Sequence, residues 1–209
     1  MIRTSSARRL RAALGTAVAA AALAACSGAP AHQGAAAVVG SDRISVAQVE
    51  ARVAAVREGA AQSGAATEEQ PGLARHAVSD LILGRVVARA LADRSLTVSQ
   101  SEVDRARSAD AQTVGSEAKL AELLRAKQGV PAADVDGFYR QQIGLVKLAG
   151  GQDPSSADGD AAIRKALVDA GTALHIEVNP RYGTWNTTEI GLEGSSENWL
   201  PASGQAAVR

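Results

Sequence analysis

The fold is decided near the start of the chain by residues 36–45, which run Ala36-Ala37-Val38-Val39-Gly40-Ser41-Asp42-Arg43-Ile44-Ser45. The small and β-branched residues of 36–40 predict a short strand, and Gly40-Ser41 predicts a tight turn into a partial second strand. Ser45 has Gln48 three residues later, which is the spacing of a capping box that satisfies free amides of a first helical turn. The stretch therefore predicts two strands followed directly by a helix.

Helical periodicity dominates the residues that follow. Val46, Val49, Val53 and Val56 repeat at three- and four-residue intervals, so they predict one apolar stripe on a first helix. Ser99 and Glu102 form a second capping box, at the start of a third helix. The remaining predicted helices run from near Pro71 to Leu91, over about 116–128, from Pro131 onward, and over about 158–170 with a stop at Gly171.

The end of the chain changes its period. Leu174, Ile176 and Val178 alternate with His175 and Glu177, the pattern of a half-buried strand. Two isolated strands at opposite ends of a helical chain need partners for their backbone groups, so we expect residues 36–40 to pair with residues 174–178. The predicted fold class is mainly α, with five to six helices and a small sheet that joins the two ends.

The composition predicts a thin core and excludes several functions. Of the 209 residues 46% are hydrophobic, but 46 of them are alanines, and the five aromatic residues all lie beyond position 137. Few rings and a formal net charge of zero argue against a nucleic-acid partner. One Cys and three His exclude a disulfide scaffold and a Cys/His zinc site. We therefore expect no metal and no cofactor.

The first 25 residues have the parts of an export signal. Four arginines precede an apolar stretch over 12–25, which as a helix spans about 21 Å and is too short to cross a bilayer. The ending Leu23-Ala24-Ala25-Cys26 looks like a bacterial lipobox, in which cleavage between Ala25 and Cys26 leaves a lipidated cysteine. A plain signal peptide is the alternative. We expect lipidation of Cys26 and a location on the extracytoplasmic face of the cell membrane, with a mature net charge near −4.

These features divide the chain into four parts. Residues 1–25 are the lipoprotein signal peptide, and residues 26–35 lack periodicity and predict a flexible tether. Residues 36–185 hold the predicted helices and strands. Residues 186–209 are polar and rich in Gly and Ser, so we expect a disordered tail.

The second helix carries the first candidate binding surface. Leu73, Ala77, Leu81, Gly84, Ala88 and Leu91 line one face, while Arg75, Ser79, Arg85 and Arg89 fall on the other. Ile82 and Val86 lie on or beside the basic side, which leaves exposed aliphatic area there unless another element covers it. Exposed aliphatic side chains on a soluble protein mark interaction sites.

No catalytic site is indicated. The sequence has no HExxH motif, no phosphate-binding loop and no Gly-x-Gly-x-x-Gly at a helix start. Its carboxylates are spread over predicted helix surfaces, without the clustering that shifts the pKa values of catalytic groups. We therefore expect that the protein is not an enzyme and has no catalytic residues.

Two stretches carry a family resemblance. Val38-Val39-Gly40-Ser41-Asp42-Arg43-Ile44-Ser45 and its helix resemble the opening of SurA-type periplasmic chaperones, and 81–83 with Leu96-Thr97-Val98-Ser99-Gln100-Ser101-Glu102-Val103 resembles the next part of that module. The arrangement is also similar to that of the lipid-anchored foldase PrsA, and it covers about 36–149. In that family a late helix and strand complete the module, a role that 158–178 would fill.

The resemblance implies binding of unfolded exported polypeptides by a chaperone module in 36–185. Relatives commonly carry a parvulin-type prolyl isomerase domain, but only the short Gly150–Asp158 segment stands where it would be inserted, so isomerase activity is not implied. Candidate client contacts are Ile82, Val86, Phe138 and Tyr139, with a core role as the alternative. Tyr182 and Trp185 are predicted to cap the terminal sheet. The alternative function is an adaptor for one folded envelope partner.

Overall fold

The computed structural model describes residues 34–62, 64 and 72–194. The predicted signal peptide, its cleavage site at Ala25, the lipidated Cys26 and residues 195–209 of the predicted tail lie outside the described residues. Six α-helices make up most of the described fold, together with short strands from the two ends of the module.

The elements follow one another in the order that the periodicity predicts. The helices are α1 (Val46–Gln62), α2 (Leu73–Ala92), α3 (Gln100–Val114), α4 (Glu117–Gln128), α5 (Val135–Leu148) and α6 (Ala157–Leu174). The strands are β1 (Ala35–Val39), β2 (Asp42–Ser45), β3 (Glu177–Val178), β4 (Thr184–Asn186) and β5 (Gly191–Glu193), with 3-10 turns η2 (Ala132–Asp134) and η3 (Pro180–Tyr182).

Both predicted capping boxes form. The Ser45 amide donates to Gln48 Oε1 at 2.8 Å, and the Gln48 amide donates to Ser45 Oγ at 3.1 Å. At the start of α3, Ser99 and Glu102 make the same reciprocal pair. These local signals place two helix starts correctly because the partners are only three residues apart.

A three-stranded antiparallel sheet in the order β2-β1-β3 joins the two ends, which confirms the predicted pairing. Ala37 faces Val178 and Val38 faces Glu177. Gly40, at the β1–β2 turn, has φ +62°, a conformation that glycine adopts without steric cost, and its amide donates to the Leu174 carbonyl at 2.7 Å.

The strand near the end is shorter than predicted, and the helix before it is longer. Helix α6 passes through Gly171 and ends at Leu174, with His175 at the C-cap. Gly171 is buried, and a Cβ there would lie 3.0 Å from Thr187 Cγ2. The glycine therefore permits a close approach within the helix, and it does not end the helix as we expected from its type.

The prediction that disorder begins at residue 186 is wrong for residues 186–194. Strands β4 and β5 form a hairpin in which Trp185 faces Leu192. Arg75 of α2 donates to the Leu192 carbonyl at 2.9 Å, and Trp185 is buried. The polar composition of this segment conceals these contacts because they come from a distant helix. Tyr182 and Trp185 are buried in the hydrophobic core beside the sheet, in keeping with the structural role predicted for them.

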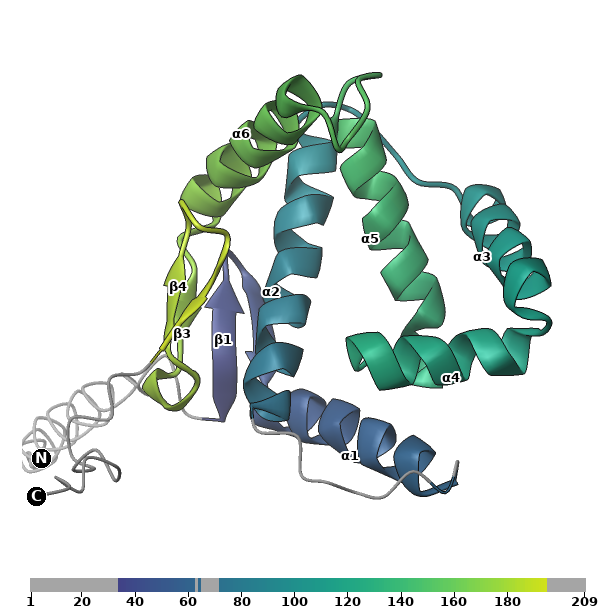
Figure 1. The fold of residues 1–209 in the computed structure, drawn as a ribbon. Coiled ribbons are helices and arrows are strands. Elements are labelled where there is room, and N and C mark those ends of the chain that lie inside the picture. Colours follow the sequence, from purple (N-terminus) through teal and green to yellow (C-terminus); the bar gives the residue numbers. More distant parts are fainter. Residues whose placement is uncertain (1–33, 63, 65–71, 195–209) are drawn as a thin grey trace, which may run out of the picture.

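The described residues contain two hydrophobic cores. The main core lies between the sheet, α1, α2, α6, the end of α5 and the β4–β5 hairpin. The second is smaller and contains Val103, Ala111, Leu120, Val130, Val135 and Tyr139. We call α3, α4, η2 and the first half of α5 the arm, and we call the rest of the described fold the main body. Figure 1 shows the arm on one side of α2 and the sheet on the other.

Ile82 and Val86 have the core role that was the alternative to client contact, since both are almost fully buried, at 0% and 1% exposure. Helix α2 contacts β1 and β2 and also contacts α5 and α6, so it is covered on more than one side (Figure 1). The periodicity of α2 indicated one apolar face. It could not reveal that α2, the central helix of the fold, is buried on a second face as well.

Candidate functional site

Helices α2 and α5 converge at one glycine. A Cβ on Gly144 of α5 would lie 2.9 Å from Val87 Cγ1 and 3.0 Å from Leu91 Cδ1 of α2. Only glycine therefore allows the two helices to come this close without a shift of their neighbours. From this contact the helices diverge toward the arm (Figure 1), and the space between them forms a groove.

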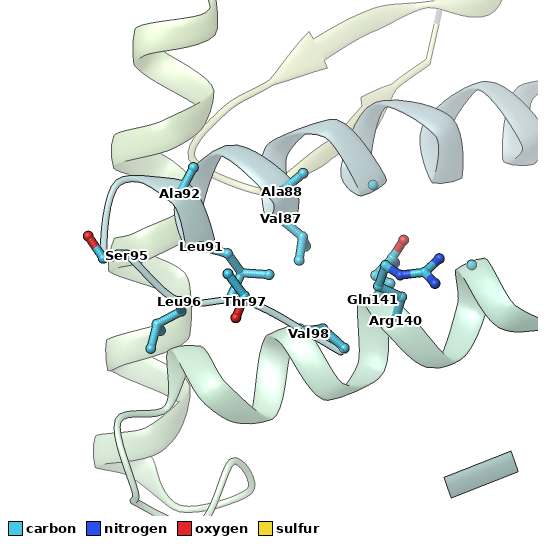
Figure 2. Close-up of a pocket in the computed structure, with 12 residues that line it drawn as sticks. Val87, Ala88, Leu91, Ala92, Ser95, Leu96, Thr97, Val98, Arg140 and Gln141 are labelled. Carbon is cyan, nitrogen blue, oxygen red and sulfur yellow. The ribbon is translucent and has the colours of Figure 1, made fainter. Parts of the chain in front are cut away.

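The upper part of this groove, which we call the apolar half, has a volume of about 650 Å³. Its walls come from α2, the α2–α3 connection and α5. Figure 2 shows Val87 and Leu91 pointing from α2 into the space between the helices, with Val98 on the connection and Arg140 and Gln141 on α5. The complete lining is Gly84, Val87, Ala88, Leu91, Ala92, Ser95, Leu96, Thr97, Val98, Gly137, Arg140 and Gln141.

Two glycines line the groove, one on each helix, and leave space beside them. A Cβ added to Gly84 of α2 would meet only Gln141 Oε1, at 3.6 Å, and one added to Gly137 of α5 would meet nothing within 4 Å. A Cβ would therefore fit at either position, in ordinary contact with Gln141 at Gly84 and in open space at Gly137. Because these two positions lack side chains, a volume between α2 and α5 stays unfilled, although the two helices are in contact at Gly144.

The lower part of the groove, the polar half, has a volume of about 510 Å³ and shares Gly84, Gly137, Arg140 and Gln141 with the apolar half. The two halves therefore adjoin each other along α2 and α5. Residues of α1, the end of α4 and η2 also line the polar half, among them Arg52, Gln128 and Asp134.

A charged cluster at the polar half links the main body to the arm. Arg52 of α1 pairs with Asp80 of α2 at 3.5 Å and with Asp134 of η2, while His76 Nε2 lies 3.4 Å from Asp80 and 3.1 Å from the Gln128 carbonyl oxygen. Burial raises the pKa of Asp80 above its usual value, and the charges of His76 and Arg52 oppose that shift. The cluster holds the end of α4 against α1 and α2.

The four predicted client contacts do not form one surface. Ile82 and Val86 lie in the main core, so the exposed area on which that prediction depended is missing. Tyr139 is 5% exposed in the arm core, and its hydroxyl donates to Asp110 Oδ2 at 2.6 Å. Burial raises the pKa of Tyr139 well above its usual value. Only Phe138, half-buried and edge-on to the Tyr139 ring, lines the groove.

Sequence reasoning missed the residues that do line the apolar half. Their signal was a row of small residues, Gly84, Ala88 and Ala92, at four-residue intervals on α2, with Gly137 and Gly144 on α5. Small residues on one helix face indicate either a close helix contact or a space. Gly144 makes the contact, whereas Gly84 and Gly137 leave the space.

The chemistry of the groove is that of a binding surface for apolar groups. Its upper walls offer aliphatic side chains and backbone, and the described residues contain no group of three His, Cys, Asp or Glu side chains that could hold a metal ion. In the same part of the chain, no helix has the length and apolar character needed to cross a bilayer.

The described fold is a helical module that is closed by its own two ends and has an apolar groove between α2 and α5. The chain matches the model of the family described as the SurA-like N-terminal domain over residues 2–148. Since the match covers more than half of the chain, the protein belongs to the SurA-like N-terminal domain family, and its helical body is a chaperone-related module.

The family match confirms the resemblance drawn from residues 36–103. No parvulin domain is detected, and residues 149–156 lead directly from α5 to α6 in the described structure. Neither the search of curated proteins nor the search of solved structures returned a match.

Proposed function

We propose that this protein is a lipid-anchored, extracytoplasmic holdase that binds segments of unfolded exported polypeptides in the groove between α2 and α5. The observation that carries the proposal is the open apolar half of that groove in a member of a chaperone-related family. Binding without catalysis fits a surface made mainly of aliphatic side chains and backbone.

The size of the apolar half suits side chains of a bound segment. Its volume of about 650 Å³ lies within the range of about 300–1,000 Å³ that ligand sites occupy. Burying one large apolar side chain contributes about 1.5–3 kcal/mol, so a few such contacts support weak binding that does not depend on one sequence. Holdase action requires this kind of contact, because clients differ in sequence and must be released.

The proposed anchor at Cys26 would hold the module near the membrane from which clients emerge. Several acyl chains are needed for stable attachment, since one chain gives only marginal binding. The test is metabolic labelling with an alkyne palmitate analogue, comparing the wild-type chain with Cys26→Ser. We expect label and membrane association only for the wild type. Equal labelling of both chains, or of neither, overturns the proposed lipidation.

The groove is tested by filling it. Gly137→Leu places a large side chain where a Cβ meets no neighbour, and replacing glycine inside a helix improves helix propensity by up to about 1 kcal/mol. We expect the variant to fold at least as well as wild type but to lose most of its suppression of aggregation of a chemically unfolded client. Ala126→Leu adds the same side chain to an exposed position of α4 outside the groove, so it is the matched control.

The outcomes separate the proposal from its alternative. A full chain that neither suppresses aggregation nor binds an unfolded polypeptide contradicts holdase action. Pulldown of the tagged chain from membranes should return a range of clients, and their number should fall with Gly137→Leu. One stoichiometric folded partner, retained by Gly137→Leu, would instead support the adaptor function.

A further inference from the structure

The charge distribution around the apolar half is one-sided. Of the residues that line it, Arg140 is the only one with a charged side chain, and none carries a carboxylate. The guanidinium lies on the α5 wall, across the groove from Val87 and Leu91 (Figure 2). A bound segment therefore meets an apolar wall and one positive charge at the same place.

Arg140 forms no direct ion pair with a carboxylate of the described residues, although its charge helps to lower the pKa of Asp136. The Arg140 Nη2 donates to Gln100 Oε1 at 2.6 Å, and Gln100 is neutral. No carboxylate of the described residues forms a salt bridge with it. The side chain is exposed, so it can turn toward a ligand without leaving a buried group unpaired.

Asp136, the carboxylate that interacts with the Arg140 charge, accepts its hydrogen bonds from other groups. Asp136, one turn before Arg140 on α5, accepts from Arg107 Nη1 at 2.6 Å and from Gln100 Nε2 at 2.9 Å. Gln100 therefore lies between the two, with its amide nitrogen directed at Asp136 and its oxygen at Arg140. Two guanidinium groups, those of Arg107 and Arg140, therefore act on one carboxylate, and only Arg107 pairs with it directly, so a net positive charge remains beside the groove.

We propose that Arg140 determines specificity in the groove, and that the favoured ligand is an extended polypeptide segment with a bulky apolar residue followed or preceded closely by Asp or Glu. The proposal rests on the proposed function, because it names the kind of segment that the same groove selects. In an extended segment, side chains on one face recur about every 6.8 Å, so an acidic neighbour can reach Arg140 while the apolar side chain occupies the cavity.

The expected effect is a preference, not an absolute requirement. An exposed ion pair contributes up to about 1 kcal/mol, which corresponds to a change in Kd of about fivefold. The preference should also weaken as salt is raised, because the pair is open to solvent.

The test measures binding of fluorescent peptides to the full chain by anisotropy. Three unstructured peptides share a central Leu and differ only in the residues two positions before and after it, which are Asp, Ser or Lys. We expect the Asp peptide to bind about three- to tenfold more tightly than the Lys peptide at low salt. Arg140→Gln should remove this difference, and Arg140→Lys should retain most of it. Arg105→Ala removes an exposed charge from α3 outside the groove lining and should leave the preference unchanged.

Each outcome decides one claim. Equal affinity for the three peptides, or tighter binding of the Lys peptide, overturns the role of Arg140 and leaves the proposed function intact. A preference that survives in Arg140→Gln but falls in Arg105→Ala also overturns it. If no peptide binds and the chain does not suppress aggregation, the proposed function fails, and the specificity fails with it.

Discussion

The main body and the arm are built in different ways. The main core joins residues from both ends of the module, since β1 pairs with β3 and α2 contacts both the sheet and α6. The arm core draws on a continuous stretch from α3 to α5. Long-range pairing fixes the body as one unit, whereas the arm depends on local contacts, on its attachment along α5 and on the charged cluster that links it to α1 and α2. The groove lies where the two units separate.

Both regions contain ion pairs, but in the arm they surround a much smaller core. Within the arm, Arg107 pairs with Glu117 at 3.3 Å and with Asp136 at 2.6 Å, and the Tyr139 hydroxyl binds Asp110. The largest fully buried side chains are nearly all in the main body. We infer that the body is stabilised mainly by burial, while the arm depends more on polar contacts around a small core.

The largest expected effect is in the main body. Ile82→Ala removes a fully buried side chain and should lower the free energy of unfolding by about 3 kcal/mol, measured by urea denaturation. Val146→Ala, at a position that is 55% exposed, should change it by less than about 0.5 kcal/mol. A stable Ile82→Ala variant with reduced client binding would restore the original prediction that Ile82 contacts clients.

A smaller effect is expected from the arm core. Leu120→Ala should cost about 2 kcal/mol, at the low end for such a change because the arm core is small. Hydrogen exchange should show the loss of protection in α3 and α4, with little change in β1 and α6. Uniform loss of protection across both regions would show that the arm and the body unfold together, which contradicts their description as two separate units.

The polar contribution to the arm is tested at a single hydroxyl. Tyr139→Phe removes the donor to Asp110 and should lower the free energy of unfolding by about 1 kcal/mol. Tyr182→Phe in the main core is the matched control, because no hydrogen bond of its hydroxyl occurs among the described residues, and it should have little effect. If the two variants lower the free energy of unfolding equally, polar contacts do not contribute more to the arm than to the main body.

The smallest expected effect concerns Glu102 in the capping box at the start of α3, and it depends on pH. Hydrogen bonds from Lys147 and from Ser99 lower the pKa of Glu102 to about 2, from its usual 4.5. The folded state therefore favours the charged carboxylate, so its stabilisation is full above about pH 4.5 and is lost as the pH falls toward about 2. Glu102→Gln should have a lower Tm than wild type at pH 7, and the difference should disappear near pH 2.

A control variant at another glutamate distinguishes the loss of the Glu102 cap from a general effect of removing one negative charge on Tm. Glu122 is an exposed residue of α4, so Glu122→Gln should leave the Tm nearly unchanged at both pH values. A difference between wild type and Glu102→Gln that persists at pH 2 would show that the carboxylate charge does not stabilise the start of α3.

Much of the fold could be predicted because its signals are local. The Ser45 and Ser99 caps and the Gly40 turn each depend on partners within a few residues, and the need of two isolated strands for partners led to the β1–β3 pairing. The burial of Ile82 and Val86 could not be predicted in this way, because the residues that cover them come from the sheet and from α6.

The groove was harder to predict than the fold. Gly84 has the same sequence appearance whether a neighbouring helix touches it or leaves a space, and only the path of α5 decides between the two. Arg140 likewise gave no signal, since its importance comes from the absence of carboxylates in a lining that three separate segments provide. Sites of this kind arise from packing, and periodicity describes one element at a time.

The pairing of β1 with β3 also sets an order of events during synthesis. The ribosome makes the chain from its N-terminus, so β1 and α2 exist long before Glu177 and Val178 can pair with them. Until α6 and β3 are made, the aliphatic faces of α2 lack their final cover, while the arm already has all of its core residues. The module therefore passes through a stage in which its own body resembles the unfolded segments that we propose it binds.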